Sequence, residues 1–187
     1  MQFVPEMPVL LAYAVGVIIL TFTPGPDMTF FLGRTLTQGV SGGFAAMAGA
    51  STGLLVHSLL VAFGLSALIL ASPAAFLILK LAGAIYLLWL AVDAIRNGSA
   101  LRLQGKAGAK PLKQVFVQGL AINLLNPKII IFFMTFLPQF VQPSDPHASG
   151  KLLFLGVMFV VIALPFTVPM ILAASRLTNW LMRNPRV

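Results

Sequence analysis

The segment Thr21–Phe31, TFTPGPDMTFF, decides the fold, because it places two prolines, a glycine and a carboxylate inside an otherwise apolar stretch. A proline has no backbone N–H and clashes with the preceding helical turn. In a lipid bilayer, the backbone groups that are freed must be satisfied by neighbouring helices or by a polar cavity. The segment therefore predicts a spanning helix that is interrupted between Pro24 and Pro26. Gly25 is expected to supply unusual torsions at the break, and Asp27 to lie in the first turn of a second half-helix.

The composition indicates an integral membrane protein. Of the 187 residues, 59% are hydrophobic and only 9% are charged, and the mean hydropathy is +0.98. A soluble domain has about 25% charged residues. The absence of cysteine excludes disulfides and thiolate metal sites. The net charge of +8 comes mostly from short connectors between apolar spans, which predicts membrane topology and a lipid partner rather than a nucleic-acid partner.

The apolar stretches predict an all-α, polytopic membrane helix bundle that forms a single transmembrane domain over residues 1–187. A spanning helix needs about 20 mostly apolar residues. Small residues in the first part of the second span indicate close contact with another helix. The five predicted spans are Pro8–Leu36, Phe44–Ala71, Ala75–Ile95, Val115–Leu137 and Leu152–Ala174.

The basic residues predict the orientation of the chain. The connector 96–114 carries five basic residues and no acidic one, and three more arginines follow the fifth span. Cytoplasmic loops are enriched in lysine and arginine. We therefore expect connector 96–114, the loop that contains Arg34 and the C-terminus to be cytoplasmic, and the N-terminus to be external.

The fourth predicted span contains a second break, in the stretch NLLNPKIIIFF, residues 123–133. Asn126 is a favourable N-cap, Pro127 suits the first helical position, and Lys128 follows. Pro127 lies 103 positions after Pro24, and each break leads into a pair of phenylalanines. The two breaks therefore share one pattern.

This spacing predicts a weak internal duplication. Pro8 and Pro111, each shortly before an apolar span, are also 103 positions apart. The first repeat covers about residues 8–95, and the incomplete second repeat covers about 115–187. Three spans per repeat would make the repeats inverted, and interrupted helices at matching positions of inverted repeats indicate the binding site of a transporter.

Asp27 and Lys128 are the leading candidates for that site. Val115 precedes Pro127 by 12 residues, which is roughly 18 Å of helix and near the middle of the bilayer. Asp27 precedes Arg34 by 7 residues, or roughly 10 Å from the inner surface. A lone charge at such depth costs at least about 2.5 kcal/mol. We expect the acid and the base to pair or to share a cavity, although a proline in a membrane helix can also be a simple packing kink.

Other polar residues leave more than one interpretation open. Lys80 could extend to the membrane surface or line the cavity. His57 has no second ligand at metal spacing, so a hydrogen-bonded core histidine is favoured over a metal ligand or a proton relay. Asn123 could line the second break or bond a neighbouring helix. We expect no metal, no cofactor and no catalytic residue, since no nucleophile–base pair and no GxSxG or HExxH motif is present.

Three motifs in order, TPGPD, KLAGAIYLLWLAVDAIR and NLLNPKIIIFFMTFLPQF, resemble the lysine exporter (LysE/RhtB-type) superfamily of bacterial inner-membrane proteins. The resemblance implies secondary efflux of amino acids or their derivatives, such as homoserine, threonine, leucine or lysine. Members usually have six spans, so the resemblance also implies that this five-span chain lacks the last helix. The family's broken segments map onto Thr23, Pro24, Gly25, Pro26 and Asp27, and onto Asn123, Asn126, Pro127 and Lys128.

The expected mechanism is export of a zwitterion against an ion gradient, favoured to be protons. The half-helix N-termini would attract the substrate carboxylate, and Asp27 would receive the ammonium group in place of Lys128 or accept the coupling proton. A cation or metal-ion exporter and a non-transporting, truncated membrane subunit remain alternatives, and a homo-oligomer stays open.

Overall fold

The computed structural model describes residues 3–65, 109–142 and 145–183, together with single positions between 74 and 92. Within these residues the chain is helical and has no strand, which confirms the all-α prediction. Most of the predicted span Ala75–Ile95, Lys80 included, and the connector up to residue 108 lie outside the described residues. The elements are α1 (Met7–Phe22), α2 (Pro26–Leu60), the π-turn η1 (Val61–Leu65), α5 (Leu112–Leu124), α6 (Pro127–Ile131), the π-turn η2 (Phe132–Phe136), the 3₁₀ turn η3 (Leu137–Phe140) and α7 (Ala148–Arg183).

The first predicted span is interrupted where its prolines indicated. Helix α1 ends at Phe22, and α2 begins at Pro26 with Gly25 as its N-cap. Thr23 has extended backbone torsions (φ −70°, ψ 115°), so the helix stops before Pro24. A residue that precedes a proline is driven out of the α region by its steric clash with the proline ring. The break is therefore a local consequence of the sequence.

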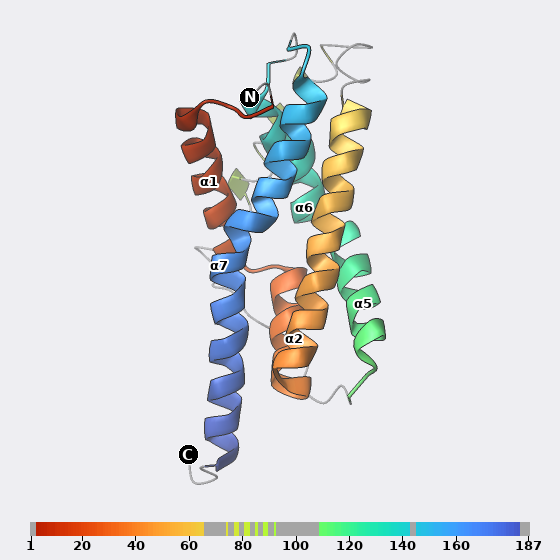
Figure 1. The fold of residues 1–187 in the computed structure, drawn as a ribbon, viewed down its shortest axis with the longest axis vertical. Coiled ribbons are helices and arrows are strands. Elements are labelled where there is room, and N and C mark those ends of the chain that lie inside the picture. Colours follow the sequence, from red (N-terminus) through yellow and green to blue (C-terminus); the bar gives the residue numbers. More distant parts are fainter. Residues whose placement is uncertain are drawn as a thin grey trace.

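Gly39 divides α2 into two segments that fold back on one another. Its φ of 73° lies in the left-handed region, which only glycine adopts at low cost. After this turn, a Cβ added at Gly43 would lie 2.9 Å from Ile171 and would also press on the Thr35 hydroxyl. Figure 1 shows the segment after Pro26 running to one end of the bundle and the segment after Gly39 returning. This turn lies between the predicted spans that end at Leu36 and begin at Phe44.

The fourth predicted span is also broken. Helix α5 ends at Leu124, and α6 begins at Pro127, so that Leu125 and Asn126 form the break. The axes of Leu112–Leu124 and Pro127–Phe140 differ by 52°. Both interrupted spans predicted from the prolines are therefore present.

The second segment of α2 packs closely against α5, as its small residues predicted. A Cβ added at Gly49 would press on the Phe116 carbonyl, and one at Gly119 would press on the Ala46 carbonyl. These contacts place the second segment of α2 and α5 side by side. Both helices run in the same direction in Figure 1. Close approach of backbones through small residues is the usual way in which membrane helices associate.

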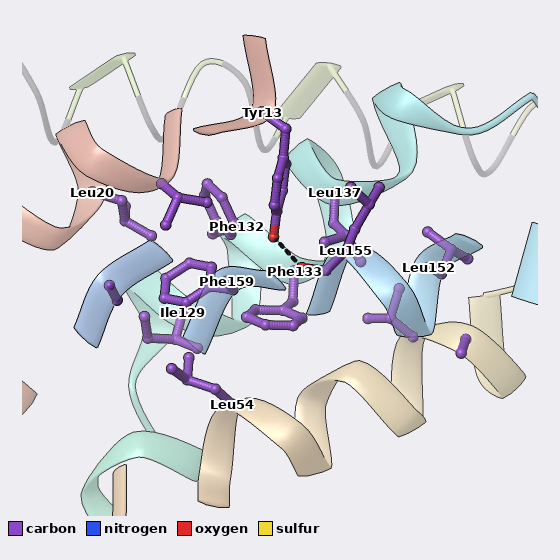
Figure 2. Packing of buried hydrophobic residues seen from close by; sticks show 14 residues of the cluster. Tyr13, Leu20, Leu54, Ile129, Phe132, Phe133, Leu137, Leu152, Leu155 and Phe159 are labelled. Carbon is purple, nitrogen blue, oxygen red and sulfur yellow. Dashed lines mark hydrogen bonds between the residues drawn. The ribbon is translucent and has the colours of Figure 1, made fainter. Parts of the chain in front are cut away.

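An aromatic cluster fills the core between α1, α6, η2 and α7 (Figure 2). Phe132 and Phe133 are almost fully buried and contact Phe159 of α7 with ring centroids 5.3 and 5.7 Å apart. The Tyr13 hydroxyl donates to the Leu155 carbonyl at 2.8 Å, as the dashed line in Figure 2 marks. A buried tyrosine hydroxyl needs such a partner, so this bond fixes α1 against α7.

Two described stretches are long and apolar enough to cross a membrane, Pro26–Gly64 and Ala148–Thr178, and the bent pair α5 with α6 to η3 makes a third. Outward positions of α1, such as Leu11 and Ile19, are about 60% exposed. In a bilayer these side chains would face lipid instead of water. The chain is therefore a helical membrane protein. The start of α1 and the end of α7 lie at opposite ends of the bundle (Figure 1).

The connector before α7 is held by Asp145. Its carboxylate accepts hydrogen bonds from the Lys151 side chain and from the His147 backbone N–H. The hydrogen bond from Lys151 has the largest effect and that from His147 the next, and both hold the pKa of the Asp145 carboxyl below its usual range. They tie the connector to the first turn of α7.

Candidate functional site

The two helix breaks meet through Asp27. Its Oδ2 accepts hydrogen bonds from Asn126 Nδ2 at 2.6 Å and from Asn123 Nδ2 at 3.2 Å. Asp27 lies in the first turn of α2, whereas Asn123 and Asn126 flank the end of α5. The carboxylate of Asp27 thus binds two side chains that lie 96 and 99 positions later in the chain.

Asn126 serves both as a helix cap and as a hydrogen-bond donor to Asp27. Its Oδ1 accepts from the Lys128 backbone N–H at 3.1 Å, which is the predicted N-cap of α6. Its amide nitrogen then points to Asp27. Because one end of the side chain is held by the cap, the other end has a fixed direction.

The Lys128 ammonium binds the end of α1. Its Nζ donates to the Thr23 carbonyl at 2.7 Å and to the Leu20 carbonyl at 3.3 Å. In a continuous helix the Leu20 carbonyl would accept from the N–H of residue 24, but Pro24 has none. Lys128 therefore replaces the missing donor, and its charge also complements the negative end of the α1 dipole.

Asp27 and Lys128 line the same cavity, which is one of the two arrangements expected of them, but they do not pair directly. The structure gives the two residues no ion pair within 4 Å, although both line one cavity. The physical reason is that each group has closer partners. Two side-chain amides donate to the carboxylate, and two orphaned carbonyls accept from the ammonium.

The expected torsional role of Gly25 is wrong. Its φ of −161° and ψ of −179° describe extended backbone that any residue adopts. The glycine instead provides space, because an added Cβ would lie 3.0 Å from Lys128 Nζ and 3.1 Å from its Cε, which is tighter than an ordinary contact. Gly25 thus lets the lysine reach across the break.

A cavity of about 80 Å³ lies beside these residues. It is large enough for several water molecules. Most of its walls are apolar, and the charged side chains that line it are Asp27 and Lys128. The described residues around it are Leu20, Thr21, Asp27, Met28, Phe31, Met47, Ala50, Ser51, Leu54, Asn123, Lys128, Ile129, Phe159, Val160, Ala163, Leu164 and Thr167.

Not every predicted residue lies on this cavity. The Thr23 hydroxyl donates to the Ile19 carbonyl at 2.8 Å, and Thr23 takes part only through its backbone. His57 is buried with Nε2 3.4 Å from the Asn123 carbonyl, and its ring centroid lies 5.7 Å from that of Phe133. This is the environment of a hydrogen-bonded core histidine. In the part of the chain that the structure describes, no group of three or more His, Asp or Glu could hold a metal ion.

Two buried oxygens in the site have no hydrogen-bond donor among the described residues. They are Asp27 Oδ1 and Asn123 Oδ1. The Asn123 oxygen lies close to Gly53, where an added Cβ would collide with it. A buried acceptor without a partner costs about 1–3 kcal/mol, so Asp27 Oδ1 is suited to receive an N–H donor that enters the cavity.

The sequence did not identify the apolar walls of the cavity. Met28 and Phe31 follow Asp27 on the first segment of α2, while Phe159 and Leu164 come from α7. Each is one of many apolar residues in its span. Regular spacing could have placed several of them on one face of a helix, but the sequence does not say which face meets which.

Comparisons with known proteins match this chain to a family of membrane translocators and to efflux proteins. Residues 18–187 match the family model described as LysE type translocator. The homoserine/homoserine lactone efflux protein of Salmonella typhimurium is 34% identical over 170 residues, which cover 91% of this chain and 82% of that protein. The leucine efflux protein of Klebsiella pneumoniae is 32% identical over 183 residues, or 95% and 84% of the two chains. That of Salmonella choleraesuis is 29% identical over 172 residues, or 90% and 80%. No solved structure gives a significant match.

Proposed function

Because the chain belongs to the LysE type translocator family, we propose that it exports amino acids or amino-acid derivatives across the bacterial inner membrane. The family match makes the chain a membrane transporter and not an enzyme. The relatives are named for efflux of homoserine, homoserine lactone and leucine. These molecules share an amino group on the carbon atom next to a carbonyl carbon, whereas the lactone has no free carboxylate. The amino group is therefore the feature that a common site would recognise.

The observation that carries the proposal is the free oxygen of Asp27. In the part of the chain that the structure describes, Oδ1 is buried without a donor, whereas Oδ2 is held by two amides that keep the carboxylate in place. An ammonium group that enters the cavity would supply the donor and the opposite charge. Charge-assisted hydrogen bonds of this kind contribute about 1.5–3 kcal/mol.

The carbonyl end of the substrate would lie toward Lys128 and the start of α2. Lys128 has three N–H donors, and two carbonyls accept from it. The first backbone N–H groups of α2 have no partner within the helix, and the first bond of the helix runs from the Thr29 N–H to the Gly25 carbonyl. These groups and the positive end of the helix dipole favour an oxygen-rich group.

Exchange of the substrate for a proton would follow from competition at Asp27. It is the carboxylate among the described residues that line the cavity, so an ammonium group and a proton would occupy it in turn. Rocking of the two repeats would then expose it to each side. In the proposed orientation the C-terminus and connector 96–114 are cytoplasmic.

The test is efflux of radiolabelled homoserine and leucine from preloaded vesicles that contain the purified chain. Asp27→Asn keeps the size of the side chain and removes its charge, and we expect efflux to fall at least about tenfold, as the loss of a charged hydrogen bond predicts. Asp145→Asn, in the connector, is the matched control and should transport normally. Unchanged efflux in Asp27→Asn would contradict the proposed site.

The same preparation addresses the alternatives. A cation exporter would need a cluster of oxygen or nitrogen ligands, and the described residues contain no such group of acids and histidines. Efflux by the purified chain alone would exclude a non-transporting subunit. The mass of the active species would decide whether it works as a homo-oligomer.

A further inference from the structure

Two helices present regularly spaced faces to the cavity. The second segment of α2 and the middle of α7 each contribute positions i, i+3, i+4 and i+7, which lie on one face of a helix. The α2 positions are Met47, Ala50, Ser51 and Leu54, and the α7 positions are Val160, Ala163, Leu164 and Thr167.

Two glycine contacts fix how these faces oppose one another. A Cβ added at Gly43 would lie 2.9 Å from Ile171, and one at Gly156 would lie 3.3 Å from Ser58 Cα and closer still to its side chain. The helices therefore run antiparallel, as Figure 1 shows, and touch at both of these points. The cavity lies between the two contacts.

Ser51 and Ala163 come opposite each other in this antiparallel register, midway between the two glycine contacts. Both side chains are small, so the helices leave space between them at this level. Larger residues flank the pair, with Met47 and Leu54 on α2 and Leu164 on α7. The space beside Asp27 therefore depends on the small size of one residue from each helix.

Ser51 also brings a free hydroxyl group. Of the three hydroxyl residues on the cavity, Thr21 and Thr167 each donate to the carbonyl four residues earlier in their own helices. The next residue on α2, Thr52, does the same. Ser51 makes no such bond in the part of the chain that the structure describes. Its hydroxyl can therefore pair with a polar group in the cavity without breaking a bond of the helix.

We propose that Ser51 and Ala163 form the subsite that selects the side chain of the exported amino acid; this inference rests on the function proposed above. Ser51 binds a hydroxyl on the substrate, Ala163 leaves room for it, and the surrounding apolar residues accept hydrocarbon. Asp27 is assigned to the amino group and Lys128 to the carbonyl end of the substrate, so no charged residue among those described around the cavity is left for the side chain, and the subsite selects uncharged side chains.

The hydroxyl is tested with Ser51→Ala. Efflux of radiolabelled homoserine and leucine is measured from vesicles that contain the parent or the variant. We expect the ratio of homoserine to leucine efflux to fall about threefold to tenfold, which corresponds to one neutral hydrogen bond. Thr52→Ala removes the adjacent hydroxyl, which does not line the cavity, and should leave the ratio unchanged.

The space is tested with Ala163→Val. The added methyl groups fill the cavity opposite Ser51, so leucine efflux should fall at least about tenfold relative to alanine efflux, as expected for steric exclusion in an apolar pocket. Val161→Leu, at an exposed position of α7, enlarges the neighbouring face and is the control. Ala163→Gly, which enlarges the space, should raise leucine efflux relative to alanine efflux.

The outcomes separate the two proposals. If the parent chain exports none of these amino acids, the proposed function fails. If the parent exports them and all ratios stay as in the parent, the subsite is wrong while the function stands. If a variant at one position does not fold, the variant at the other position tests the subsite. Ser51→Ala and Ala163→Gly both make the side chain smaller, so neither introduces a steric clash.

Discussion

The two helix breaks share a sequence pattern but are stabilised in different ways. At the first, Pro24 deprives the Leu20 carbonyl of its donor, and the replacement comes from Lys128, 108 residues away. At the second, Pro127 deprives the Asn123 carbonyl in the same way. That carbonyl accepts locally from the Asn126 N–H at 3.0 Å and lies 3.4 Å from His57 Nε2.

This difference shows that the stabilisation of the first break, though not its formation, depends on a residue of the second. The second break caps itself, because Asn126 lies next to the residues whose backbone it satisfies. The first has no such side chain, and its carbonyls accept from Lys128 at the start of α6. Two similar sequence patterns can therefore yield one break whose backbone groups are satisfied locally and one whose backbone groups are satisfied only when α6 packs against the end of α1.

The largest effect on stability is expected from Lys128→Met. It leaves the Leu20 and Thr23 carbonyls without their donor, which should destabilise the protein by about 1–3 kcal/mol. If Lys128 substitutes for the missing proline N–H, Pro24→Ala should lessen this loss, since residue 24 could then donate to Leu20. Thermal unfolding in detergent of the parent, both single variants and the double variant measures the coupling. An equal loss in both backgrounds would mean that Lys128 does not replace that donor.

A smaller effect is expected from Asn126, and two substitutions separate its roles. Asn126→Ala removes both the N-cap and a donor to Asp27, and the lost cap alone should cost about 1 kcal/mol. Asn126→Ser retains a capping oxygen but has no amide to reach Asp27, so stability should stay near that of the parent while efflux falls. Unfolding and vesicle efflux are measured on the same samples. Equal efflux in the serine variant and the parent would show that the amide does not position Asp27.

The smallest effect is expected from His57→Phe. The Asn123 carbonyl retains the Asn126 N–H, so the loss in stability should stay below about 1 kcal/mol, within the range of a single neutral hydrogen bond. Efflux driven by a pH gradient should change little. Abolished proton-driven efflux in a stably folded variant would instead assign His57 to a proton relay and overturn its interpretation as a core residue.

The sequence anticipated the elements of the site better than their partners. Proline and the polar residue beside it act within a few positions, so both breaks, the cap at Asn126 and the start of α2 at Pro26 followed from local rules. The actual hydrogen-bond partners of Asp27 and Lys128 did not follow. A charge only indicates that it needs a partner, and amides or carbonyls can satisfy it as well as an opposite charge does.

Gly25 and Ser51 illustrate the same limit. Gly25 was assigned a torsional role, yet the structure shows that it leaves room for Lys128 of the second break. Ser51 was one small residue in a run that indicated helix contact, and its place on the cavity depends on the register between α2 and α7.

By itself, the sequence determined a helical membrane protein with two interrupted spans, because backbone donors and apolar length are properties of the local chain. The tertiary structure alone decided which groups satisfy the interrupted backbones and which side chains enclose the cavity. In lipid, apolar faces do not distinguish one neighbouring helix from another. The choice is made by glycine contacts and long-range hydrogen bonds, which exist only once the helices have packed.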